Sequence, residues 1–169
     1  MKRRLFDYIV VLSTILLFSG CTSSKSTENK SIVLDKGSFS ITCSTEQKDT
    51  AMNQQIKVTY NFNDNQYAIN YDVVTTQKFN KKSVYDTYKE AQIETTKSAT
   101  DEILYDLETD DKNLTLIFTM AIPNTNLDDY SSEEEKNTLK ASQILKRIEN
   151  TTDAKYKCKI KGINRDKLN

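Results

Sequence analysis

The chain has 169 residues, enough for one folded domain but too few for a multidomain enzyme. Lys plus Arg and Asp plus Glu each total 24, so the formal net charge is zero and no basic excess indicates nucleic-acid binding. Histidine and tryptophan are absent, which excludes an imidazole base, a Ser-His or Cys-His pair, and a histidine metal ligand.

Residues 1–20 have the layout of a secretory signal peptide. Lys2, Arg3 and Arg4 supply a positive start, and the apolar run Tyr8–Phe18 follows. As a helix this run covers about 16 Å, roughly half of the ~30 Å hydrocarbon core, so we expect a cleaved segment.

The apolar run ends in Leu17-Phe18-Ser19-Gly20-Cys21, which resembles the lipobox of bacterial lipoproteins. In a lipobox, small residues precede a cysteine that becomes lipid-modified, so Cys21 is the predicted lipidation site and the first mature residue. A diacylglyceryl group on Cys21 provides two acyl chains, which suffice for stable membrane attachment where one chain is marginal. We therefore expect a lipid-anchored protein on the extracytoplasmic face of the cell membrane. The alternatives are an ordinary signal peptide and an uncleaved anchor, with Cys21 as an unmodified third cysteine.

Residues 21–36 are rich in Ser, Thr, Lys and Asn and contain too little apolar surface to fold. We interpret them as a flexible tether that reaches on the order of 20 Å. Residues 37–169 then make up a single domain of the lipoprotein.

The folded part opens with three predicted strands. Apolar and polar residues alternate over Phe39–Cys43, Ile56–Phe62 and Tyr67–Val73. The turn at Asn63–Gln66 suits a β-hairpin, because Asn and Asp side chains bond to their own backbone and tolerate positive φ.

A helical period follows at residues 81–97, with Asn80 or Ser83 as its cap and one face made of Val84, Tyr88, Ala91 and Thr95. A second hairpin spans residues 103–122, with its turn at residues 109–113. Ile117 interrupts the polar side of its second strand, which indicates a strand covered on both faces.

Ser132 and Glu135 form a capping-box signature, and a helical stripe continues from there to about Glu149. Tyr156, Cys158 and Ile160 then alternate with lysines in a last strand. The predicted order is βββ-α-ββ-α-β, an α+β domain with a mainly antiparallel β-sheet and two helices packed on it.

Cys43 and Cys158 remain once Cys21 is assigned to lipid, and they lie on the first and last predicted strands. An even number of cysteines in an exported chain indicates a disulfide. Two buried free thiols are the alternative. A redox enzyme is disfavoured, because the chain has no Cys-x-x-Cys motif.

Three further groups of residues have chemistry that a ligand could use. The densest acidic cluster comprises Asp128, Asp129, Glu133, Glu134 and Glu135. Its carboxylates suit Ca²⁺ or Mg²⁺, but their spacing is not that of a calcium loop. We therefore favour stabilisation of a helix start and expect no metal or cofactor. Six aromatics could line a groove, although they occupy inward strand positions and core packing is favoured: Tyr60, Phe62, Tyr67, Tyr71, Tyr105 and Phe118. Lysines at residues 78–82 and 155–161 could contact anionic headgroups or simply coat solvated strands.

Several of these features together resemble the YehR-like family of small bacterial lipoproteins. They are the lipobox Ser19-Gly20-Cys21, the Cys43 strand, the Val58–Asn65 hairpin, the helix containing Ala91, and Cys158. The resemblance implies a similar fold and no settled activity, so it transfers no catalytic residue.

The sequence therefore favours a binding or interaction module in the cell envelope, which meets an unknown envelope protein or a small ligand and no nucleic acid. We expect no enzymatic activity, since no recognisable catalytic motif is present. The alternatives are a carboxylate-dependent envelope enzyme acting on a glycan and a passive surface protein.

Overall fold

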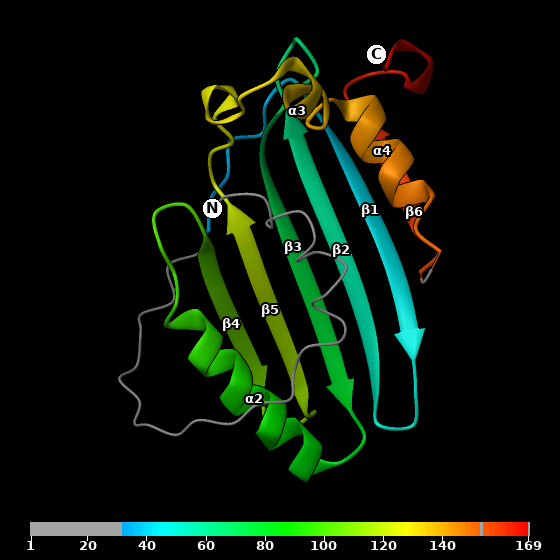
Figure 1. Ribbon diagram of the computed structural model, residues 1–169. Coiled ribbons are helices and arrows are strands. Elements are labelled where there is room, and N and C mark those ends of the chain that lie inside the picture. Colours follow the sequence, from blue (N-terminus) through cyan, green and yellow to red (C-terminus); the bar gives the residue numbers. More distant parts are fainter. Residues whose placement is uncertain (1–31, 153, 169) are drawn as a thin grey trace.

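The computed structural model describes residues 32–152 and 154–168, which form one antiparallel sheet (Figure 1). Its strands in chain order are β1 (Phe39–Lys48), β2 (Met52–Phe62), β3 (Ala68–Phe79), β4 (Leu104–Asp110), β5 (Thr115–Ile122) and β6 (Lys157–Lys161). Across the sheet their order is β4-β5-β3-β2-β1-β6, and every neighbouring pair is antiparallel. The α+β class predicted from the sequence is confirmed.

In the described residues, three α-helices accompany the sheet: α2 (Lys82–Thr96), α3 (Glu133–Asn137) and α4 (Ala141–Glu149). Single 3-10 turns lie at Leu127–Asp129 and Arg165–Lys167. In Figure 1, α2 lies beside β4 and β5, and α4 lies near β1 and β6 at the other edge. The inward side chains of α2 and α4 contact the same face of the sheet, which we call the helix-bearing face.

The larger hydrophobic core lies between α4 and the sheet, because alternate residues of the strands point to the helix-bearing face. Ile41, Tyr60, Tyr71 and Ile122 stand side by side in one cross-strand row of this core. A smaller cluster joins Tyr85 of α2 to Phe79 and Leu116 of the sheet.

The β2–β3 hairpin closes through the predicted turn. The backbone N–H of Tyr67 donates to Asn63 Oδ1 at 3.0 Å, and Gln66 adopts a φ of +65°. The register shifts by one residue between Asn61 and Phe62, so β3 begins at Ala68 and not at Tyr67 as the alternation predicts. Tyr67 instead forms an isolated bridge with Lys140.

The continuous helix predicted from Ser132 to Glu149 is wrong in one respect, because the structure divides it into α3 and α4. The backbone N–H of Ala68 donates to the carbonyl of Leu139, and that of Ala141 donates to the carbonyl of Gln66, both at 3.0 Å. These bonds hold the intervening chain in an extended conformation, with Lys140 at ψ 143°, and a helix cannot continue through such a residue. Leu139 is buried at this break.

The prediction for α2 also needs correction. Lys81 occupies the N-cap position without a side-chain cap, whereas Asn80 donates to the carbonyl of Thr50 and Ser83 lies inside the helix. The most buried side chains of α2 are Tyr85 and Gln92. The face of α2 that meets the sheet therefore includes Tyr85 and Gln92, which the predicted face of Val84, Tyr88, Ala91 and Thr95 lacks.

The prediction that Ile117 marks a strand covered on both faces also needs correction. Its register partners are Thr76 on β3 and Glu108 on β4, so it lies on the face opposite α2 and α4. Ile117 is half-buried there. We call this second side of the sheet the helix-free face, and in the described chain neither α2 nor α4 packs its buried side chains against it.

Candidate functional site

The structure joins Cys43 of β1 to Cys158 of β6 by a disulfide, in agreement with the pair predicted from the sequence. The two residues are direct register partners with their Cα atoms 4.0 Å apart. The bond closes a loop with a sequence separation of 115 residues. The chain-entropy model assigns such a loop roughly 4 to 5 kcal/mol of stability, so the disulfide ties the short edge strand β6 firmly to the sheet.

The predicted lipidation site Cys21 and most of the predicted tether lie outside the described residues. Within residues 32–152 and 154–168, no helix is long and apolar enough to cross a membrane.

The predicted acidic cluster lies on the chain between β5 and α4. Asn126 Oδ1 accepts from the Asp128 N–H at 3.1 Å, and Ser132 Oγ accepts from the Glu135 N–H at 3.1 Å. Glu135 Oε2 in turn accepts from the Ser131 N–H at 2.9 Å, so the capping signature is used to start α3. In the described part of the chain, no group of three or more acidic or cysteine side chains has the arrangement of a metal site.

The predicted aromatic set divides between core and partly covered positions. Tyr60, Phe62, Tyr71 and Phe118 are buried in the larger core, where the rings of Tyr60 and Tyr71 lie 5.1 Å apart. Tyr67 and Tyr105 are half-buried. Core packing therefore accounts for the four buried rings.

Burial sets the ionisation of these tyrosines. It raises the pKa of Tyr60 to about 12, although the nearby positive charge of Arg147 acts in the opposite direction. Burial also raises the pKa of Tyr71. Arg147 belongs to α4 and donates to the carbonyl of Thr138, across the break that separates α3 from α4.

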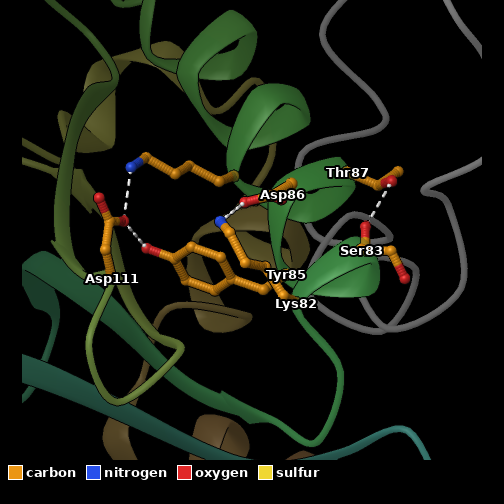
Figure 2. A network of polar contacts seen from close by, with 7 residues as sticks. Lys82, Ser83, Tyr85, Asp86, Thr87 and Asp111 are labelled. Atoms are coloured by element: carbon orange, nitrogen blue, oxygen red, sulfur yellow. Dashed lines mark hydrogen bonds and ion pairs between the residues drawn. The ribbon is translucent and has the colours of Figure 1, made fainter.

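A polar network at α2 joins residues that no sequence pattern brings together (Figure 2). The Tyr85 hydroxyl donates to the carboxylate of Asp111 in the β4–β5 turn, and Lys89 Nζ lies 2.6 Å from the same Asp111 oxygen. Figure 2 shows Tyr85 pointing from the helix to Asp111, with the Lys82–Asp86 ion pair beside it. No sequence signal marks this network, because Tyr85 and Asp111 lie 26 residues apart.

The charges of that network shift the pKa values of its members. Burial, and then the hydrogen bond to Asp111, raises the pKa of Tyr85 to about 12. The Lys89 ammonium and the Tyr85 hydroxyl lower the pKa of Asp111. Each acid-base group here has a protein partner, so we interpret the network as a connection between α2 and the β4–β5 turn and not as a catalytic centre.

The helix-free face carries opposite charges at its two edges. Register places Lys157, Lys159 and Lys161 of β6 beside Ser44, Thr42 and Ser40 of β1. The same register, followed strand by strand, brings Asp106, Glu108 and Asp110 of β4 onto this face at the far edge. Among the described residues no ion pair involves any of these six side chains.

Hydroxyl and amide side chains occupy much of the sheet between these edges. Asp72 lies near the middle of the helix-free face and is half-buried. Burial raises the pKa of Asp72, while the charge of Lys57 and a hydrogen bond from Thr59 oppose that rise. One end of the face is crossed by the chain before β1, where Asn70 Nδ2 donates to the carbonyl of Asp35 at 2.9 Å.

Comparison with known proteins adds little to this geometry. No protein-family model matches the chain, and no curated protein matches it. Among solved structures, the chain is similar to the NMR structure of a protein from Streptococcus pneumoniae TIGR4. That likeness has 13% sequence identity and a TM-score of 0.39 and covers 84% of this chain and 99% of the other.

Proposed function

We propose that the protein is a lipoprotein anchored through Cys21 to the extracytoplasmic face of the cell membrane, and that its folded part binds a partner in the cell envelope. The observation that carries this proposal is the Cys43–Cys158 disulfide. Disulfides persist in oxidising compartments and are rare in the cytosol, so the bond supports export. The lipobox resemblance of Ser19-Gly20-Cys21 supports lipid attachment at the front of the chain.

The shape of the sheet supports a binding role. The helix-free face presents polar and charged side chains from all six strands. A sheet face of this kind can meet another protein without first unfolding any element, because its side chains already point outward.

The experiment follows the full chain in its bacterial host with labelled palmitate. We expect label on the wild-type protein and its recovery in the membrane fraction. Cys21→Ser removes the label and leaves the protein unprocessed or released. A Cys43→Ser and Cys158→Ser double variant is the matched control, because it removes the same kind of side chain and keeps the label.

The proposal is wrong if the Cys21→Ser protein stays in the membrane fraction after its signal peptide has been removed. It is equally wrong if the wild-type chain is found inside the cell with all three thiols free to react with an alkylating reagent. Both results test the lipid anchor independently of the folded part, because neither measurement depends on the strand order.

A further inference from the structure

The two edge strands of the sheet are complementary in charge. β6 carries Lys157, Lys159 and Lys161, and all three are exposed. At the opposite edge, β4 carries Asp106, Glu108 and Asp110 at the same alternate spacing. Because side chains alternate between the faces of a sheet, both sets of three point to the helix-free face.

The directions of these two strands also match. Six antiparallel strands place β4 and β6 five steps apart, so the two edge strands run in opposite directions. A second copy that continues the same sheet would bring its β4 alongside β6 as an antiparallel neighbour. Within one molecule the two strands stay apart, since five strand spacings amount to about 24 Å.

One register satisfies charge and packing together. If Lys159 faces Glu108 of the second copy, Lys157 faces Asp110 and Lys161 faces Asp106. The same register sets Ile160 opposite Leu107 on the other side of the joint, and both are half-buried apolar residues that pack against the larger core. Pairs of opposite charge that face each other across antiparallel strands stabilise their pairing.

We propose that the protein associates with further copies of itself, edge to edge, through β6 of one copy and β4 of the next. Lysines on an edge strand ordinarily oppose pairing with arbitrary strands. Here they reject neutral and basic strands and accept an acidic one, which makes the edge selective. The contact uses a different surface on each partner, so it can add further copies without closing into a ring.

This inference rests on the strand order and the charges, and it stands whether or not Cys21 carries lipid. The central pair is the best one to test, because Asp110 also accepts hydrogen bonds from Asn113 and Asp106 accepts one from the N–H of Leu107. The side chains of Lys159 and Glu108 are exposed and make no hydrogen bond or ion pair within the described residues.

The first measurement is sedimentation velocity on the full chain in detergent. We expect reversible oligomers whose association weakens about tenfold at ~1 M salt, where the Debye length falls to about 3 Å.

Lys159→Glu and Glu108→Lys each replace an attraction with a repulsion and weaken association about tenfold. The double variant Lys159→Glu with Glu108→Lys restores it, because the charges are exchanged. Lys78→Glu, on the same face of the inner strand β3, is the matched control and leaves association unchanged.

The second measurement needs no variant, so it remains decisive if a substituted chain fails to fold. Equal amounts of unlabelled and ¹⁵N-labelled chains are mixed and treated with a carbodiimide, which joins a lysine to a carboxylate without a spacer. We expect mixed-label peptides that join the β6 lysines to the β4 acids. A chain that stays monomeric, or linked peptides that exclude these two strands, overturns the proposal and leaves the lysines as simple protection of the edge.

Discussion

The helix-bearing face is stabilised in two different ways at its two ends. At the α4 end, a cluster of fourteen buried residues of the described chain includes Cys43 of the Cys43–Cys158 disulfide. At the α2 end, the buried cluster contains three residues, and the charged pair Lys89–Asp111 holds the Tyr85 hydroxyl. The comparison shows that one sheet can hold one helix by a large apolar core with a disulfide, and another by a smaller apolar cluster with a charged network at its margin. Only the second arrangement should respond to pH and salt.

Removal of the disulfide is the largest test of the α4 end. The double variant Cys43→Ser and Cys158→Ser should lower the free energy of unfolding by about 4 kcal/mol, because the unfolded chain regains its loop entropy. Urea unfolding of the oxidised wild type and the variant measures the difference. Reduced wild type serves as the control and should match the variant. A loss below about 1 kcal/mol would show that the bond constrains the unfolded chain far less than its loop length implies.

Truncation of one apolar side chain on each helix compares the two ends directly. Ile144→Ala in α4 removes a fully buried side chain and should cost about 3 kcal/mol, since it leaves a cavity in the larger core. Val84→Ala in α2 removes a half-buried side chain and should cost about 1 kcal/mol. Thermal and urea unfolding supply both values. Equal losses at the two positions would contradict the distinction between the two ends.

Tyr85→Phe tests the charge network with a smaller effect. It removes one hydrogen bond to an exposed carboxylate and should cost about 1 kcal/mol at neutral pH. The matched control is Tyr60→Phe, whose hydroxyl makes no hydrogen bond to the described residues and should change stability less.

The pH dependence of the Tyr85→Phe difference has a definite sign. The folded state binds the Tyr85 proton more tightly than the unfolded chain does, with a pKa of about 12 against 10.0. It binds the Asp111 proton less tightly than the ordinary value of 3.8 implies. The advantage of the wild type should therefore be complete between pH 3.8 and 10.0. It should shrink at lower pH as Asp111 is protonated, and it should be lost between pH 10 and 12 as Tyr85 ionises. A difference that stays flat beyond both limits would contradict this assignment.

Local sequence patterns determined the elements of this protein. Alternation predicted every strand, and the Asn63–Gln66 turn predicted the first hairpin, because side-chain period and turn chemistry depend only on neighbouring residues. The placement of Cys43 and Cys158 on the first and last strands, with the even cysteine number, predicted their disulfide. Cys21 was assigned from its local setting alone and stays a prediction.

The tertiary structure decided what depends on contacts between distant residues. The bonds from Ala68 and Gln66 to the segment around Leu139 interrupt the helical stripe, although that stripe reads as continuous. The meeting of Tyr85 with Asp111 likewise follows from the packing of α2 on β4 and β5. The strand order puts the lysines of β6 and the acids of β4 at opposite edges of one face. Strands pair so that the apolar side chains of the whole sheet are buried, and neighbouring residues in the sequence do not decide this.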